Sequence, residues 1–301
     1  MIARASPRKW LLAIDGSLNA DRAADYVARW ARPLGVTEVH VFNAQPLESY
    51  RAYALNRNAI LVEATEHGAR ATAIARKALD DAGIAYRMHT ELGEPADVIV
   101  RAAQTEQAAE ILLGSRGLGA IANLALGSVA YKVIHLAEVP VTVVTSPHAE
   151  ANLPAGGRGD VHRVLLAVDG SEHAARAVDY ICGFADEGLP IEATLLNVQL
   201  PILSGNVRRF VSQEMIDSYY REEGEAALQD AKQALTRAGI RFESRIMAGH
   251  LAQTIVRLAE QDRCTRIVMG TRGLGAIGNV VLGSVAYNVV PLASIPVTLV
   301  K

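Results

Sequence analysis

Two glycine-rich segments with the same spacing contain the residues of this sequence that are best suited to chemistry. The first runs from Gly114 to Ser128 and reads GSRG, nine residues, then GS; the second runs from Gly270 to Ser284 and reads GTRG, nine residues, then GS. Glycine lets the backbone approach a ligand and turn consecutive N–H groups toward phosphate oxygens. Ser128 and Ser284 each precede a helical pattern, so we expect them to cap helices whose N-termini meet the same anion. The pattern predicts a phosphate cradle without a lysine.

An ordinary turn would be the better interpretation of a single GxxG. Here the motif occurs twice with equal spacing, each time directly behind a predicted strand, and this favours a role in binding. The side chains of Arg116 and Arg272 are expected either to reach phosphate oxygens or to remain solvated in the loop. The glycines of the predicted cradle are Gly114, Gly117, Gly127, Gly270, Gly273 and Gly283.

An aspartate follows the first apolar run of each half of the chain. Asp15 and Asp169 both stand in an Asp-Gly-Ser sequence, which is good turn chemistry by itself. Ligands of parallel sheets bind at the carboxyl ends of strands, where both aspartates are expected. We therefore favour ligand contact over a purely structural turn.

These motifs belong to an internal duplication. The sequence LLAIDGS at 11–17 recurs as LLAVDGS at 165–171, and the segment Gly114–Tyr131 is identical to Gly270–Tyr287 at 14 of 18 positions. Most of the remainder agrees only in hydrophobic pattern, so the glycine segments are the first place to look for a shared site.

The length of 301 residues fits two domains. A stretch rich in proline, glycine and alanine separates the two copies and reads as a linker. The predicted domains are residues 1–147 and 162–301, joined by 148–161.

Within each copy, short apolar runs alternate with helical patterns. Five strands joined by crossover helices predict a doubly wound α/β domain, with a mainly parallel sheet and helices on both faces. In the first half, strands are expected near 10–14, 38–43, 86–91, 111–113 and 141–145, and helices over 20–31, 62–82, 95–107 and 128–136.

The composition excludes several classes of protein. A formal net charge of −2 gives no reason to expect a nucleic acid or an anionic membrane as a partner. The two cysteines are far apart, and the eight histidines show no HxH or HExxH spacing, so no metal site made of protein alone is predicted. The uncharged stretch 276–300 is interrupted by two prolines, so we expect a buried helix and strand there rather than a membrane span. The first apolar run is too short for a signal peptide, which favours a cytoplasmic location.

With these motifs the sequence resembles the ATP-binding branch of the universal stress protein family, in its form with two domains in one chain. The family signature reads Gly, two residues, Gly, nine residues, Gly-Ser/Thr, and both segments satisfy it. The resemblance implies two Rossmann-like (adenine nucleotide alpha hydrolase-like) domains, with ATP across the ends of the first, second and fourth strands. ADP and AMP are alternative ligands, and Mg²⁺ would arrive with the nucleotide, near Asp15 and Asp169.

The resemblance also implies roles around the loops. The aspartates would contact the adenosine moiety or the metal. Ala13 and Ala167 would line the base pocket, and Ala44 and Val198, which follow the second strands, would offer backbone groups to the adenine. Val129 and Val285 would continue the helix starts that bind phosphate.

The preferred function is a nucleotide-dependent regulatory module of the stress response with at most weak ATP hydrolysis. The sequence has no GxxxxGK[ST] loop and no evident base, which argues against efficient phosphoryl transfer. A slow ATPase or an autophosphorylating protein, with Ser128 or Ser284 as acceptor, is the first alternative. An interaction scaffold with vestigial nucleotide sites is the second. The turns at 93–95 and 249–251 are expected to have little role in binding.

The last strands of the two halves follow prolines and are apolar, and such edges invite pairing. Together with the resemblance, this predicts that the two domains pair about a pseudo-twofold axis, and that two chains can associate as a homodimer.

Overall fold

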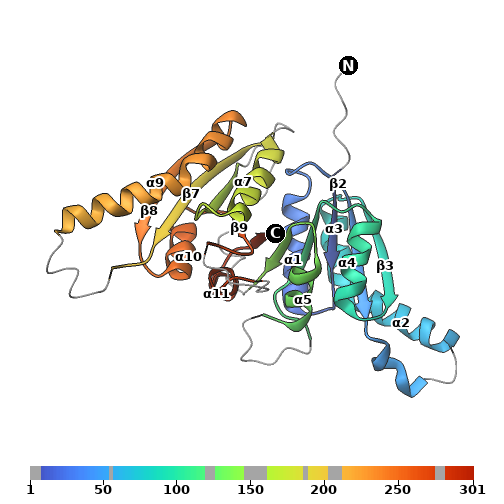
Figure 1. Ribbon diagram of the computed structural model, residues 1–301. Helices are drawn as coiled ribbons and strands as arrows, with labels where there is room; N and C mark the ends of the chain where they lie inside the picture. The colour runs from blue at the N-terminus through green and yellow to red at the C-terminus, as the bar shows by residue number, and fades with distance from the viewer. Residues whose placement is uncertain are drawn as a thin grey trace. The chain divides into compact units, whose positions relative to one another are not determined.

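The computed structural model describes residues 8–53, 57–118, 126–145, 161–185, 189–202, 212–274 and 282–301. The chain divides into two compact units, one in each half (Figure 1). Each unit contains five parallel strands and its own helices, and each is described by itself.

The first unit is built on a parallel sheet with the strand order β3-β2-β1-β4-β5. Its central strands are continuous apolar runs because both faces of the sheet are covered by helices; Leu11, Leu12, Ile111 and Leu112 are fully buried. The strands are β1 (Arg8–Ala13), β2 (Val36–Gln45), β3 (Tyr86–Leu92), β4 (Glu110–Gly114) and β5 (Val141–Val144).

Helices cover both faces of this sheet. Helix α1 packs with α3 on one face, and α4 packs with α5 on the other. Helix α1 starts after Ser17, whose Oγ accepts a hydrogen bond from the Ala20 amide. The helices of the unit are α1 (Leu18–Trp30), the 3₁₀ helix η1 (Leu47–Tyr53), α2 (Arg57–Ala71), α3 (Ala73–Asp81), α4 (Pro95–Thr105) and α5 (Ser128–Leu136).

The single helix expected over 62–82 is wrong in one respect, because the structure interrupts it at Thr72. The Thr72 hydroxyl donates to the Gly68 carbonyl oxygen at 2.7 Å, four residues earlier. Back-bonding of this kind bends helices. The result is two shorter helices, α2 and α3, and α2 begins earlier than expected.

The second unit repeats the arrangement with the order β8-β7-β6-β9-β10, again all parallel. Helices α7 and α9 pack together, as do α10 and α11. The strands are β6 (His162–Ala167), β7 (Ile191–Gln199), β8 (Arg241–Ala248), β9 (Arg266–Gly270) and β10 (Val297–Val300). The helices are α7 (Glu172–Ala185), α9 (Gln213–Arg237), α10 (Leu251–Gln261) and α11 (Ser284–Leu292).

The predicted doubly wound α/β class is therefore confirmed in both halves. The uncharged stretch near the end of the chain contains α11 and β10. Among the residues that the structure describes, no helix is long and apolar enough to cross a membrane. The expected pairing of the two units through their last strands stays a prediction.

Candidate functional site

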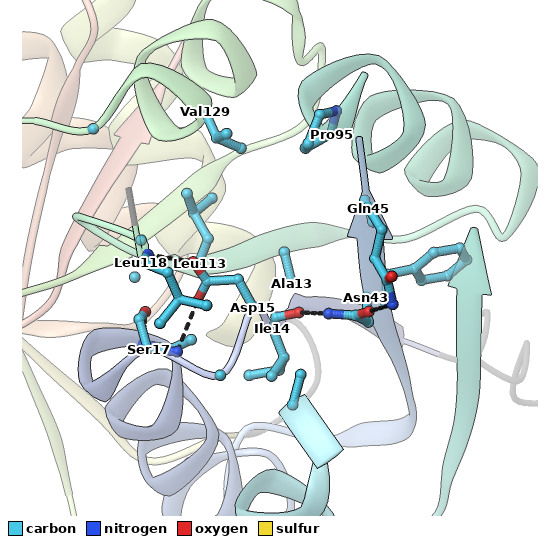
Figure 2. Close-up of a pocket in the computed structure, with 18 of the residues that line it drawn as sticks. Ala13, Ile14, Asp15, Ser17, Asn43, Gln45, Pro95, Leu113, Leu118 and Val129 are labelled. Atoms are coloured by element: carbon cyan, nitrogen blue, oxygen red, sulfur yellow. Dashed lines mark hydrogen bonds between the residues drawn. The ribbon is translucent and has the colours of Figure 1, made fainter. Parts of the chain in front are cut away.

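A cavity of about 980 Å³ lies in the first unit at the carboxyl ends of β1, β2 and β4 (Figure 2). Strands β2 and β3 are added on one side of β1, and β4 and β5 are added on the other. The point between β1 and β4 where the order switches forms a crevice, and parallel sheets bind ligands in such crevices. The starts of α1 and α5, part of η1, and parts of α2, α3 and α4 also line the cavity. The cavity is thus where the fold predicts a ligand.

The structure brings all nine predicted site residues of the first half to this cavity. They come from the ends of β1 and β2, from the loop after β4, and from the first turn of α5. They are Ala13, Asp15, Ala44, Gly114, Arg116, Gly117, Gly127, Ser128 and Val129. Their contacts with a ligand remain predictions.

Asp15 joins the end of β1 to the glycine loop. Its Oδ1 accepts a hydrogen bond from the Ser17 amide and its Oδ2 accepts one from the Leu118 amide, both at 3.0 Å (Figure 2). A Cβ added at Gly117 would overlap Asp15 Oδ2. The aspartate therefore closes a turn, as one interpretation of the sequence held, and it also lines the cavity.

The glycine loop is fixed to the start of α1. The Arg116 carbonyl oxygen accepts hydrogen bonds from Ser17 Oγ and Asn19 Nδ2, each at 3.2 Å. Gly114 lies so close to α1 that an added Cβ would be 2.7 Å from the Asn19 carbonyl carbon. These contacts join the described beginning of the loop, residues 114–118, to the start of α1.

The expected helix caps need a correction of one residue. Helix α5 begins at Ser128, so Gly127 is the N-cap, and likewise Gly283 is the N-cap of α11, which begins at Ser284. Glycine has no side chain that could accept a hydrogen bond from the first turn, so the free amides of α5 are left for another acceptor. Ser128 and Val129 line the cavity at this helix end.

A series of hydrogen-bonded polar side chains lines the part of the cavity near β2 and η1, away from the glycine loop. Asn43 Nδ2 donates to the Ile14 carbonyl oxygen at 2.7 Å, and Gln45 Nε2 donates to Asn43 Oδ1 (Figure 2). The Tyr50 hydroxyl contacts Gln45 and lies 3.1 Å from His67 Nδ1. Asn43 and Gln45 recur in the second half of the sequence as Asn197 and Gln199, and neither pair was among the predicted site residues.

The charges around the cavity are of both signs. Asp21 lines it beside Asp15, and the pKa of Asp21 is raised by burial and by the nearby charges of Asp25 and Asp15. Arg116 supplies positive charge from the loop, and it forms no ion pair with any side chain that the structure describes. Asp21 lies one helical turn after Ser17 and was not among the residues predicted from the sequence.

Pro95 also lines the cavity, together with Ile99 from the same helix (Figure 2). The 93–95 turn was expected to have little role in binding; the structure places its Pro95 on the cavity lining, and the role of the turn in binding stays a prediction. The turn follows β3, whose carboxyl end reaches the same edge of the sheet as β1 and β2. That position was a signal in the sequence that could have identified it.

The second unit repeats the central contacts. Asp169 accepts hydrogen bonds from the Ser171 and Leu274 amides, both at 3.0 Å, and a Cβ at Gly273 would overlap its Oδ2. Asn197 Nδ2 donates to the Val168 carbonyl oxygen at 2.8 Å. The predicted residues here lie at the ends of β6, β7 and β9 and at the start of α11; they are Ala167, Asp169, Val198, Gly270, Arg272, Gly273, Gly283, Ser284 and Val285.

Two substitutions distinguish the units around these contacts. Ala175 occupies the position of Asp21, so the second unit lacks that carboxylate. His173 occupies the position of Asn19, and its pKa is lowered by burial and by the charges of Arg272 and Arg176. The two sites therefore share their scaffold but differ in charge.

Comparison with known proteins agrees with the duplication. The model of the Universal stress protein family matches residues 7–145 and again residues 160–301. Universal stress protein YxiE of Bacillus subtilis is 30% identical over 149 residues, which are 46% of this chain and 99% of that protein. A universal stress protein of Mycolicibacterium smegmatis is 25% identical over 313 residues, covering 100% of this chain and 99% of that protein.

A solved structure of a universal stress protein from Archaeoglobus fulgidus has the same fold along nearly the whole length. It superposes with a TM-score of 0.68 at 24% identity and covers 97% of this chain and 96% of that chain. The fold of both halves is thus shared with a protein of known structure.

Proposed function

Because this chain belongs to the universal stress protein family, we propose that it is a nucleotide-dependent regulatory module of the stress response, and that its first unit binds ATP in the cavity at the ends of β1, β2 and β4. ADP and AMP would compete for the same place. The second unit carries the same loop and is proposed as a second, weaker site.

The observation that carries this proposal is the convergence of the glycine loop and the start of α5 on one cavity. A helix N-terminus favours negative charge through its free amides and its dipole. Arg116 adds a cation on the same side. The phosphates would therefore lie against the loop and α5.

The adenosine would lie toward β1 and β2. Ala13 and Ala44 form a shallow apolar wall. The hydrogen-bonded side chains of Asn43, Gln45 and Tyr50 place amide and hydroxyl groups behind it. The cavity volume of about 980 Å³ is large enough for a nucleotide. Apolar walls with a few oriented polar groups are typical of ligand sites.

Mg²⁺ fits the acidic side of the cavity. Asp15 and Asp21 both line it. Carboxylates and phosphate oxygens are the ligands that Mg²⁺ uses in nucleotide sites. In the proposed complex the ion would lie between these carboxylates and the phosphates, and it would offset their repulsion.

Slow ATP hydrolysis or autophosphorylation is the second candidate function. It is favoured by Ser128, whose side chain is exposed at the helix start that lines the cavity. The lining residues include no lysine, and a lysine commonly stabilises the charge of phosphoryl transfer. We expect slow or absent turnover.

Calorimetric titration of the full chain with ATP tests the proposal. Gly117→Ala should weaken the tighter event at least tenfold, because the new methyl group collides with Asp15 and displaces the loop. Gly273→Ala, the matched change in the second unit, should leave that event unaltered. Equal ATP affinity of wild type and Gly117→Ala would overturn the proposal. Phosphate release and radiolabelling of Ser128 in the same samples decide between the two candidates.

A further inference from the structure

A cluster of two histidines and a glutamate lies in the first unit outside the cavity, on the face of the sheet that α4 covers. His40 lies in β2 and His89 in β3, and Glu106 is the C-cap residue of α4. The β2–β3 register places Phe42 beside His89, so the two histidines lie diagonally on the same face. Helix α4 packs on β2 and β3, and this brings Glu106 over them.

We propose that His40, His89 and Glu106 form a binding site for a divalent transition-metal ion of the zinc type. This inference is independent of nucleotide binding.

The two distances from His40 Nδ1 to the other donor atoms fit one small ion. His40 Nδ1 lies 3.3 Å from His89 Nε2 and 3.4 Å from Glu106 Oε2, and all three atoms lie within 4.8 Å of one another. Ligand atoms about 2.0–2.1 Å from a tetrahedral Zn²⁺ lie about 3.3–3.4 Å apart. Two imidazoles and a carboxylate are a ligand set that zinc commonly uses, and the fourth position would be left for water.

The second ring nitrogen of His40 faces a carboxylate. His40 Nε2 lies 3.3 Å from Glu38 Oε2, and Arg87 Nε donates to Glu38 Oε1 at 2.7 Å. Metal-binding histidines usually donate their other N–H to a carboxylate, which fixes the tautomer and the ring orientation. Glu38 would therefore keep His40 Nδ1 free to bind the ion.

Burial and backbone geometry hold the cluster in place. His40 is only 1% exposed, and the His89 ring is stacked on Phe42 with centroids 4.3 Å apart. Gln107 takes a left-handed conformation with φ of 55°, which ends the helix directly after Glu106. Glu106 is 27% exposed, so an ion could enter from the solvent beside it.

The second unit provides a natural comparison, because its equivalent positions hold no histidine. Thr194, Arg245 and Asp262 occupy the places of His40, His89 and Glu106. Arg245 Nη2 pairs with Asp262 Oδ1 at 3.3 Å, and Thr194 Oγ1 donates to Asp262 Oδ2 at 3.4 Å. There a guanidinium group balances the carboxylate, and in the first unit a metal ion would do so.

Equilibrium dialysis of the metal-stripped full chain against Zn²⁺, followed by metal analysis, tests the proposal. Wild type should bind one Zn²⁺ ion. The His89→Arg and Glu106→Gln variants should bind it at least tenfold more weakly. Glu38→Gln should weaken binding by about 10- to 100-fold, as expected for a residue that orients a ligand. His250→Asn removes an exposed histidine at the start of α10 and should change nothing.

The His89→Arg change introduces the residue that the second unit already uses, so an arginine–carboxylate pair can replace the ion and the fold can be checked by circular dichroism. Absence of Zn²⁺ uptake by wild type, or equal uptake by His89→Arg, would overturn the proposal. Anomalous diffraction from Zn²⁺-loaded crystals of the wild type should place the ion beside His40 Nδ1, and an ion found only elsewhere would also overturn it.

Discussion

At the scale of single residues, Asp15 and Gly117 restrict each other. The carboxylate binds two backbone amides, and its Oδ2 occupies the space that any side chain at position 117 would need. The glycine is thus required by the protein's own loop and not only by the close approach of a phosphate. The same relation holds between Asp169 and Gly273.

This restriction predicts a strong energetic coupling. Asp15→Ala should lower the free energy of unfolding by about 1–3 kcal/mol through lost hydrogen bonds, and Gly117→Ala should lower it by about 1–3 kcal/mol through overlap. The double variant should lose at least 0.5 kcal/mol less than the sum, since the alanine at 15 makes room for the new methyl group. Urea unfolding of the four proteins measures the coupling, and simple additivity would contradict it.

The two cysteines should differ in reactivity. Burial raises the pKa of the Cys264 thiol to about 12, so almost no thiolate is present near pH 8. In a Cys182→Ser variant, a thiol reagent should therefore label the folded chain very slowly, and it should label one thiol at once after unfolding. The matched Cys264→Ser variant, which keeps the less buried Cys182, should react faster when folded. Rapid labelling of Cys264 in the folded chain would argue against this environment.

At the scale of elements, close packing of helices on strands depends on two glycines. Gly68 of α2 faces the Thr90 side chain, and Gly224 of α9 faces Ile246 in the equivalent place; a Cβ at either glycine would overlap its neighbour. Helix α2 therefore approaches β3, and α9 approaches β8, more closely than alanine would allow.

Alanine substitution of helical glycines should consequently have opposite effects. Gly68→Ala and Gly224→Ala should destabilise the chain by about 1–3 kcal/mol through overpacking, despite the better helix propensity. Among the described residues, an added Cβ at Gly183 of α7 meets no atom within 4 Å apart from its chain neighbours and the backbone of its own helix, so Gly183→Ala should stabilise by about 0.5–1 kcal/mol. Thermal unfolding of the three variants gives the signs, and a stabilising Gly68→Ala would refute the packing argument.

Elements with strong local signals could be predicted from the sequence. Buried apolar runs identified the parallel strands, and the repeated glycine spacing located the loop of both units. The break at Thr72 depends on one hydroxyl turned back to a carbonyl, and the helix pattern continues on both sides of it. The His40, His89 and Glu106 cluster depends on the β2–β3 register and on where α4 ends, so residues distant in the sequence meet without any recognisable spacing.

At the scale of the whole molecule, the chain carries two copies of one scaffold with different charges around their loops. The first unit has the carboxylate pair of Asp15 and Asp21, whereas the second has Asp169 and Ala175 at the corresponding places. His173 of the second unit takes the place of Asn19. Binding that depends on Mg²⁺ should therefore be stronger in the first unit.

Nucleotide should stabilise the chain mainly through that unit. A ligand that binds only the folded state at 100 times its Kd adds about 2.7 kcal/mol to the free energy of unfolding. Scanning calorimetry with ATP and Mg²⁺ should show this gain in wild type and Gly273→Ala, and should show most of it lost in Gly117→Ala and Asp21→Ala. Loss of the gain in Gly273→Ala alone would assign the tighter site to the second unit.

The glycine cap of α5 has a consequence for how an occupied cavity could be sensed. Since Gly127 supplies no side-chain acceptor for the first amides of α5, an anion bound there would complete the first turn of the helix and slow the exchange of its amide protons with water. Departure of the anion would return those amides to solvent and let the turn fray. The order of this helix end would then depend on whether the anion is bound. A binding partner could recognise that difference without contacting the ligand.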